Sequence, residues 1–260
     1  MRSEKMAARE NQLLQTLRTA GSLTTEDAVR LVGVSESTVR RLFIDLEKKG
    51  VAVKTYGGIR IVQGAASEYS YDRLETVRVE VKQRIAFHAA SLIESGDVVY
   101  LDTGTTAAQL AVALAQRIRA GELKDVRLFT NSLVNLNILS QVSLVSLIGG
   151  EYRANRRDFH GYLAEETLKR LHFTRNFFGA DAFDLSYGFS ASDFSSARMN
   201  ELILQNSDAR CAILDSSKFG CRSVVAFAKL SDVSTVVTDD ELDPETAARI
   251  RESGKELVLV

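Results

Sequence analysis

The stretch YLDTGTTAAQL, Tyr100–Leu110, joins the pattern of a β-strand to that of a helix at a single glycine. Apolar residues lead up to Asp102, and Gly104 precedes two threonines that can cap the apolar-periodic helix after them. Junctions of this kind hold phosphates, because glycine lets a ligand approach the backbone and the first helical amides point at an oxyanion. The stretch therefore predicts an α/β unit with a candidate phosphate site.

The alternation of strand and helix continues through residues 81–260. Strands that alternate with helices predict an α/β domain around a mostly parallel sheet. The pattern predicts helices at 81–93, 105–120, 132–141, 161–171, 195–207 and from Asp243–Pro244, and strands at 97–104, 126–131, 143–150, 175–183, 210–217, 223–228, 234–240 and 256–260. Residues 63–80 show no clean period and are interpreted as a linker.

Residues 1–62 predict a separate small domain of three helices and a hairpin. A leucine-bearing helix ends near Gly21, and Thr24 can cap a second, short helix. After a tight turn, Ser35 can cap a third helix that stops at Gly50. The alternating stretch VAVKTYGGIRIV, with its YGG turn, predicts a β-hairpin. This order of elements is that of a winged helix-turn-helix.

The third helix has one face that suits a DNA groove. Val39, Phe43 and Leu46 fall at i, i+4 and i+7 and should face the core, which leaves the arginines on the other side. Arginine makes paired contacts to guanine and hydroxyls reach phosphates, so the start of this helix predicts operator contact. The candidate DNA-binding residues are Ser35, Glu36, Ser37, Thr38, Arg40, Arg41, Lys54, Tyr56 and Arg60.

The distribution of charge supports this division of labour. Residues 1–60 carry 11 Lys/Arg and 7 Asp/Glu, a net charge of +4, whereas residues 61–260 carry 22 and 27, a net charge of −5. A basic head on an acidic body suits contact with nucleic acid through the head.

Several strand ends in the larger domain carry polar residues or glycine. In open α/β sheets ligands lie beyond the carboxyl ends of the strands, so four such ends predict a shared pocket. Asp102 suits a sugar hydroxyl and Lys218 a phosphate, although threonine and asparagine at these positions also cap helices. The candidate effector-binding residues are Asp102, Gly104, Thr105, Thr106, Thr130, Asn131, Ser132, Gly149, Gly150 and Lys218.

Other signatures are missing from the sequence. It holds no GxxxxGK[ST], no GxGxxG after a strand and no GxSxG, so a P-loop enzyme, a dinucleotide site and a hydrolase elbow are unsupported. The three histidines and two cysteines lack metal-ligand spacing, and no cofactor or metal is expected. The charged N-terminus and the lack of a long apolar run predict a cytoplasmic protein without a membrane span.

The motifs together resemble the DeoR family of bacterial transcriptional regulators. The head does so through LTTEDAVRLVGVSESTVRRLFIDLEKKGVAVKTYGGI, and the body through YLDTGTT, FTNSL, LIGG, NFFGADAF, LDSSKFG and VVTDD. The resemblance implies a winged helix-turn-helix joined to a sensor domain related to sugar-phosphate isomerases and CoA-transferases. It also implies a repressor, not an enzyme, that leaves the operator of a carbohydrate operon when a phosphorylated sugar binds.

The chain departs from the family pattern at two places. Leu42 follows Arg40 and Arg41 where relatives usually have aspartate, and Ser196 and Arg198 stand where many have glutamate and lysine. Two other interpretations stay open: an isomerase-like enzyme with a DNA-binding head, and a constitutive DNA-binding protein with a vestigial body. A single head offers little surface for specificity, so a symmetric dimer or tetramer on inverted half-sites is expected.

Overall fold

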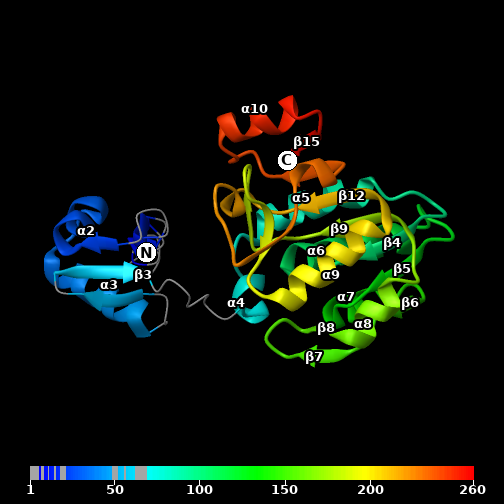
Figure 1. Ribbon diagram of the computed structural model, residues 1–260, viewed down its shortest axis with the longest axis horizontal. Helices are drawn as coiled ribbons and strands as arrows, with labels where there is room; N and C mark the ends of the chain where they lie inside the picture. The colour runs from blue at the N-terminus through cyan, green and yellow to red at the C-terminus, as the bar shows by residue number, and fades with distance from the viewer. Residues whose placement is uncertain are drawn as a thin grey trace. The chain divides into compact units, whose positions relative to one another are not determined.

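The computed structural model describes all residues except 1–5, 7–8, 11, 15, 18–21, 49–51, 56 and 62–68, and the side chains at 48, 53, 60 and 61. The chain divides into two compact units, Met1–Tyr69 and Ser70–Val260. Figure 1 shows the elements of both units, which are described separately below.

The smaller unit confirms the expected helices and hairpin. Its helices are α2 (Thr25–Val32) and α3 (Glu36–Lys48), and residues 6, 9–10, 12–14 and 16–17 are also helical. Strands β2 (Ala52–Thr55) and β3 (Gly58–Ile61) form the hairpin, and β1 (Ser22–Thr24), which was not predicted, adds a third antiparallel strand. Leu13, Leu17, Val39, Phe43 and Leu46 are buried in its apolar core.

The larger unit is built on a seven-stranded parallel sheet in the order β15-β14-β12-β9-β4-β5-β6. These strands are β4 (Val98–Leu101), β5 (Arg127–Thr130), β6 (Val145–Leu147), β9 (Phe173–Phe178), β12 (Ser207–Ile213), β14 (Thr235–Thr238) and β15 (Glu256–Leu259). All six neighbouring pairs run parallel, as the alternation of strands and helices predicted.

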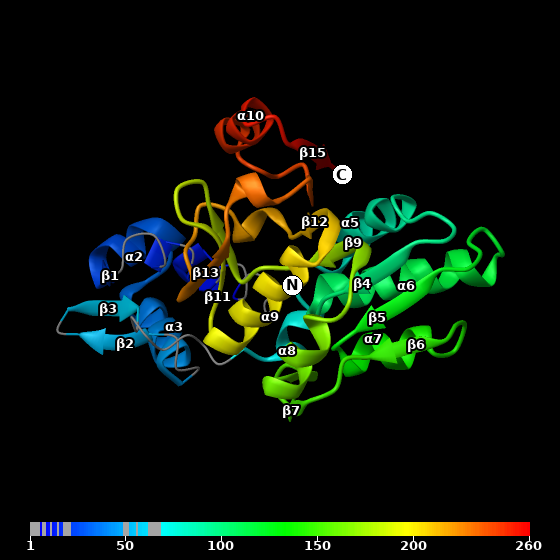
Figure 2. The ribbon, with the colours of Figure 1, turned by 45° about the vertical axis from the view of Figure 1, so that its right-hand side comes forward.

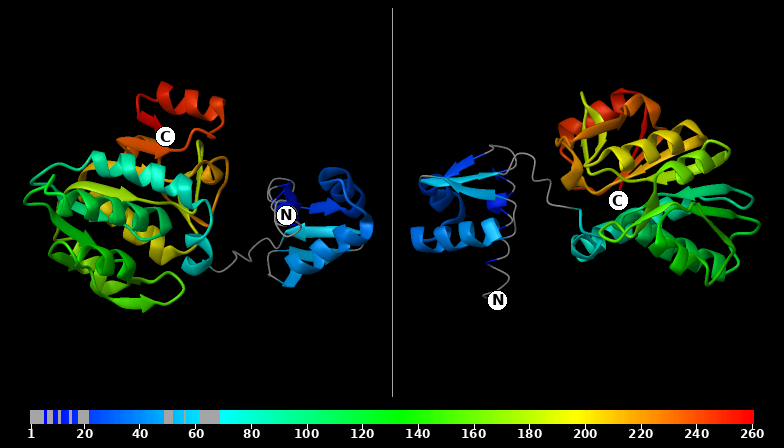
Figure 3. Two further views of the ribbon diagram at one scale, coloured as in Figure 1. Left: turned by 180° about the vertical axis from the view of Figure 1, so that it is seen from behind. Right: turned by 60° about the horizontal axis from the view of Figure 1, so that its bottom comes forward.

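Helices cover both faces of this sheet. Figure 1 shows α9 (Phe194–Gln205) on the near face, with α8 (Tyr162–Leu168), and Figure 3 shows α5 (Val79–Ser91) and α6 (Thr105–Arg119) on the opposite face. The two layers pack on different side chains of the same strands: Val99 and Leu101 belong to the core under α5 and α6, and Tyr100 to the core under α8 and α9. The remaining helices are α7 (Leu133–Leu139) and α10 (Pro244–Glu252).

Two small antiparallel sheets flank the central one. β10 (Ala182–Asp184), β11 (Gly188–Ala191) and β13 (Val225–Ala228) form one, and β7 (Glu151–Arg153) and β8 (Asp158–His160) form the other, visible beside α8 in Figure 2. The prediction of one strand over 175–183 is wrong, because β9 ends at Phe178 and β10 begins at Ala182. The β7–β8 hairpin and β11 were not predicted.

The predicted linker over residues 63–80 is too long. Residues 62–68 lie outside the described part, but α4 (Tyr71–Glu75) and the start of α5 fall within the predicted linker. α4 has only five residues, so no apolar period could show in the sequence; it is anchored by a single buried aromatic side chain, Tyr71, and capped by Ser70. The larger unit therefore begins at Ser70, eleven residues before the predicted start at Val81.

Candidate functional site

The strand order of the large sheet reverses at β4. From this strand the chain moves outward to β5 and β6, and later returns to β9 on the other side of β4. A crevice beyond the carboxyl ends of the strands forms at such a reversal and is where ligands of open α/β folds bind. The loops after β4, β5 and β9 therefore define the candidate site.

Asp102 lies at this reversal, directly after β4. Its side chain is 6% exposed, and its Oδ2 accepts a hydrogen bond from the Gly179 amide after β9 (3.3 Å). Burial raises the pKa of Asp102 to about 7, an effect only partly offset by hydrogen bonds from the Thr103 and Gly179 amides. A buried carboxylate without a direct cationic partner is a strong acceptor for a ligand's hydroxyl or ammonium group.

The loop after Asp102 leads into the N-terminus of α6. Gly104 occupies its N-cap position with φ +101°, a conformation that other residues rarely adopt, and no side chain caps the helix there. The first-turn amides, at Thr105 and Thr106, therefore lack a capping acceptor, and the first turn contains no acidic residue. The arrangement suits an anion, as the sequence predicted.

The three candidates at the end of β5, Thr130, Asn131 and Ser132, form hydrogen bonds to neighbouring loops. The Thr130 hydroxyl donates to the Leu101 carbonyl (2.7 Å) and accepts from the Ser132 amide (3.1 Å). The Asn131 side chain accepts from the Tyr100 hydroxyl (2.7 Å) and donates to the Phe159 carbonyl (2.9 Å). Ser132 caps α7. Their side-chain groups hold β8 and α7 against the end of β5.

The β7–β8 hairpin contributes two arginines to the site: Arg153 at the end of β7 and Arg156 in the turn. Arg153 makes a two-pronged ion pair with Asp158 (2.8 and 2.6 Å) and reaches Asp193 (2.9 Å). Arg156, 7% exposed, contacts Asp181 (3.1 Å) and Asp193 (3.2 Å). Asp181 follows β9 and Asp193 caps α9, so these pairs close the site between the turn and α9.

The α9 side of the site also offers a free acceptor. Ser196 receives Arg153 Nη2 at 3.1 Å, and Asn200 lies one helical turn further along the same face. Asn200 is 6% exposed, and its Oδ1 has no hydrogen-bond partner in the part of the chain that the structure describes. A buried amide oxygen without a donor is costly, and a ligand hydroxyl would satisfy it.

The three remaining candidates are arranged differently from the β4 loop. A Cβ on Gly150 would lie 2.3 Å from the His160 carbonyl, so this glycine is required by the close approach of β8, whereas the space beside Gly149 is open. Lys218 lies in the short 3-10 helix η1 (Ser216–Lys218) after β12, and β9 separates β12 from β4. Lys218 is half-buried, and its ammonium has no ion-pair partner among the described residues.

Sequence reasoning missed Arg153, Arg156, Asp158, Asp181 and Asp193. The stretch EYRANRRDFH, 151–160, carries three arginines within five residues, but such a run more often marks an exposed charged turn. A positional signal existed for Asp193, which lies just before the predicted helix at 195–207, but not for Asp181, which lies inside the predicted strand at 175–183.

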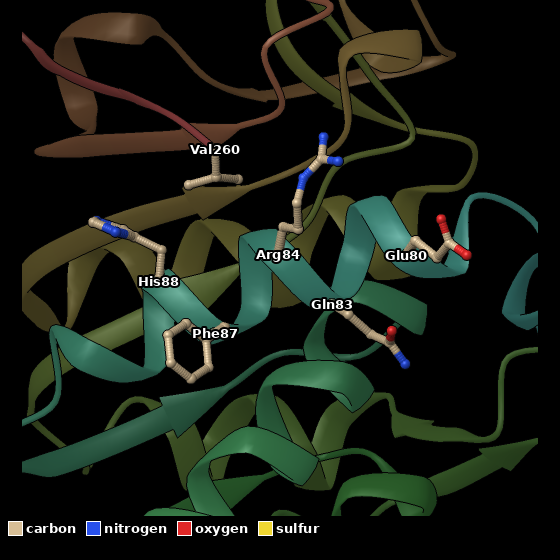
Figure 4. A pocket seen from close by; sticks show the side chains of 6 residues that line it. All are labelled: Glu80, Gln83, Arg84, Phe87, His88 and Val260. Atoms are coloured by element: carbon tan, nitrogen blue, oxygen red, sulfur yellow. The ribbon is translucent and has the colours of Figure 1, made fainter.

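A hollow of about 570 Å³ lies along α5, beside Val260 at the end of β15 and not at the ends of β4, β5 and β9. Figure 4 shows Arg84 and His88 pointing toward the C-terminal residue Val260, with Phe87 on the other side of the helix. Arg84 is already paired with Asp240 (3.1 Å). None of the candidate effector-binding residues lines this hollow, so we do not assign the effector to it; its lining is Glu80, Gln83, Arg84, Phe87, His88 and Val260.

The candidate DNA-binding face is exposed on α3. Glu36, Ser37, Arg40 and Arg41 are exposed, and Arg40 pairs with Glu36 one turn earlier (2.7 Å). The Ser35 hydroxyl lies 3.0 Å from those of Ser37 and Thr38. Lys54 is exposed on β2, whereas Tyr56 and the side chain of Arg60 lie outside the described residues.

Leu42 does not lie on this face. It is 1% exposed and belongs to the core of the smaller unit, beside Val39, Phe43 and Leu46. The departure from the family pattern therefore extends the apolar core and leaves both arginines in solvent.

The described residues form neither a metal site nor a membrane-spanning helix. Within the described part of the chain, no group of three or more His, Cys, Asp or Glu side chains could hold a metal ion. No described helix is both long and apolar enough to cross a membrane.

These features define a helix-turn-helix protein with an α/β ligand-sensing unit, and the comparisons agree. The model of the DeoR-like helix-turn-helix domain matches residues 9–64, and that of the DeoR C-terminal sensor domain matches residues 77–240. The chain belongs to the DeoR family of transcriptional regulators.

Curated relatives match over nearly their full length, and they are transcriptional regulators. A protein of Escherichia coli O157:H7 named as an aga operon transcriptional repressor is 31% identical, with 97% of this chain and 93% of the relative covered. The lactose phosphotransferase system repressor of Staphylococcus aureus strain N315 is also 31% identical, covering 94% and 95%. A ribose 5-phosphate isomerase of Plasmodium falciparum aligns over 55% of this chain and 53% of its own at 17% identity, with a TM-score of 0.41.

Proposed function

We propose that the protein represses a carbohydrate operon and leaves its operator when a phosphorylated sugar binds at the strand ends of the larger unit. The observation that carries the proposal is that an uncapped helix N-terminus and a buried carboxylate lie in the same loop after β4. The first suits a phosphate and the second suits sugar hydroxyls. Two relatives whose names describe repressors of an aga operon and of a lactose phosphotransferase system support the choice of a sugar.

The ligand would lie across the reversal at β4. Its phosphate would meet the amides at Gly104, Thr105 and Thr106, with Lys218 supplying positive charge from the β12 side. Its hydroxyls would meet Asp102 and the free Oδ1 of Asn200. The α3 surface with Arg40 and Arg41 would contact operator bases and phosphates, with the protein working in the cytoplasm.

The arrangement does not favour the enzyme. Acid–base isomerisation needs a placed acid or base that can exchange its proton with the substrate. Asp215, the carboxylate that follows β12, is engaged by Arg78 (3.4 Å) and by the Ser217 amide (3.1 Å). Asp215 follows β12, which β9 separates from β4, so it does not supply a second carboxylate beside Asp102.

The test uses operator DNA selected from a random library by the wild-type protein, with a panel of pentose and hexose phosphates. We expect one phosphate ester to raise the melting temperature and to weaken operator binding, because a ligand that binds one state stabilises it. Thr105→Val and Lys218→Ala should bind operator normally but require at least about tenfold more sugar phosphate for release. Arg119→Ala, which removes one exposed charge from the far end of α6, is the control.

Release of DNA by the unphosphorylated sugar alone would remove the phosphate from the proposal. Turnover of any sugar phosphate would instead support the isomerase-like enzyme.

We further infer that the regulator works as a symmetric dimer or tetramer on inverted half-sites. One α3 helix contacts only a few base pairs. Two DNA-binding units related by a two-fold axis contact twice as many, so the factor by which the operator is preferred over other DNA is squared. Footprinting should show two protected half-sites in phase with the DNA helical repeat.

A further inference from the structure

Helix α4 is the first element of the larger unit, so the chain reaches it directly from the DNA-binding unit. Its N-terminal end is held on the β7–β8 turn by three contacts. The Tyr71 amide donates to the Asn155 carbonyl (2.9 Å), and Arg157 Nη2 pairs with Asp72 Oδ1 (2.7 Å). The Arg157 guanidinium also lies 5.1 Å from the centre of the Tyr71 ring. Tyr71 is 4% exposed, and burial raises its pKa to about 12.

The same turn has its other arginines inside the candidate effector site. Arg153 and Arg156 reach Asp158, Asp181 and Asp193, whereas Arg157 points to α4. Arg157 also accepts a hydrogen bond from the Leu133 amide (3.0 Å) at its carbonyl, which ties the turn to the loop after β5. One short turn therefore contacts the site on one side and α4 on the other.

The C-terminal end of α4 is fastened to the opposite side of the site. Lys82 is 5% exposed and donates to the carbonyls of Leu74 and Val77, both at 2.7 Å. Between them and α5, Arg78 contacts Asp239 (2.8 Å) and Ser216 (3.1 Å). Ser216 begins the loop that carries Lys218.

We propose that α4 transmits effector occupancy to the DNA-binding unit, with Arg157 and Asp72 as the positioning pair. This inference rests on the proposed function. A ligand among the strand-end loops competes with Arg153 and Arg156 for their carboxylate partners and attracts Lys218. The β7–β8 turn and the loop after β12, which hold the two ends of α4, therefore shift relative to each other. A helix of five residues held at both ends turns when its supports move, and this changes the direction in which the chain enters the larger unit at Ser70. Effector and operator then bias one shared element, which is the physical basis of coupling.

The test separates coupling from binding. Asp72→Asn and Arg157→Ala remove the ion pair; both positions are at least partly exposed, and neither touches the ligand in the proposed arrangement. Arg73→Ala is the matched control, because Arg73 is exposed on the same helix and has no ion pair among the described residues. For each protein, sugar-phosphate affinity is measured by calorimetry, and operator affinity is measured with and without the active sugar phosphate.

We expect Asp72→Asn and Arg157→Ala to bind the sugar phosphate and the operator within about threefold of wild type, while the effect of one on the other falls at least about fivefold. The charge exchange Asp72→Arg with Arg157→Asp should restore part of the coupling, which a merely structural role would not predict. Arg73→Ala should behave as wild type.

Full release of DNA from both variants at wild-type effector concentrations would overturn the role of α4 and leave the proposed function standing. Failure of the wild type to bind any phosphorylated sugar would overturn the proposed function, and this inference with it.

Discussion

The two units of the chain treat charge in opposite ways. In the smaller unit, the described buried residues are apolar, and ion pairs such as Arg40–Glu36 stay in solvent, with side chains 65% and 59% exposed. In the larger unit, Arg153 and Asp158 are paired with side chains 17% and 1% exposed. The buried polar and charged residues of the described chain all lie between Lys82 and Asp239.

The difference fits the partner proposed for each unit. A surface that binds DNA meets a highly charged, hydrated partner, so its arginines stay in water without a desolvation cost until DNA binds. A small ligand must be surrounded, so the groups that recognise it are buried and have to be paired with one another in its absence. Changes on the DNA face should therefore alter affinity, and changes at the strand ends should alter stability as well.

The largest contrast is expected from breaking one ion pair in each unit. Asp158→Asn leaves Asp193 as the remaining charged partner of Arg153 among the described residues, and we expect a loss of about 3 kcal/mol in the free energy of unfolding, the lower end for a broken buried pair. Glu36→Gln, its solvent-exposed counterpart on α3, should cost less than about 1 kcal/mol. Urea unfolding followed by circular dichroism measures both. Equal losses would mean that burial does not distinguish the two units.

The next effect is the pH dependence of the larger unit. The pKa of Asp102 is about 7 in the folded protein against 3.8 for a free side chain. Between these values the folded state holds a proton that the unfolded chain has lost, so stability falls as the pH rises through this window. From pH 5 to pH 7 the loss should be roughly 2–3 kcal/mol, and Asp102→Asn should abolish it. An unchanged pH slope in this variant would show that Asp102 is not the responsible group.

The smallest effect concerns affinity alone. Arg40→Ala and Arg41→Ala should each weaken operator binding by roughly 1–3 kcal/mol if the lost contact is to a base. Their melting temperatures should stay near that of wild type, because both side chains are exposed. Gel shifts measure the first quantity and thermal unfolding the second. Wild-type affinity in both variants would remove the N-terminal part of α3 from the DNA interface.

Much of the fold could be predicted from the sequence because its helices and strands depend on residues that are close together in the chain. Val39, Phe43 and Leu46 recur with the helical period. This period can be recognised in the sequence because the residues that share a helical face are only three or four positions apart. The strand and the helix on either side of Gly104 are likewise adjacent in the chain. Local pattern therefore determined the helix-turn-helix unit, the α/β alternation and the position of Asp102 at a strand end.

The tertiary structure alone decided which strand ends meet and what closes the site. Arg153 finds Asp193 forty residues later, and Tyr71 packs on a turn more than eighty residues further along the chain. Such pairs leave no periodic trace, because their partners are brought together by strand order and not by local spacing. The same holds for α4, whose single anchoring ring is matched by an arginine that the sequence presents only as one of three in a charged turn.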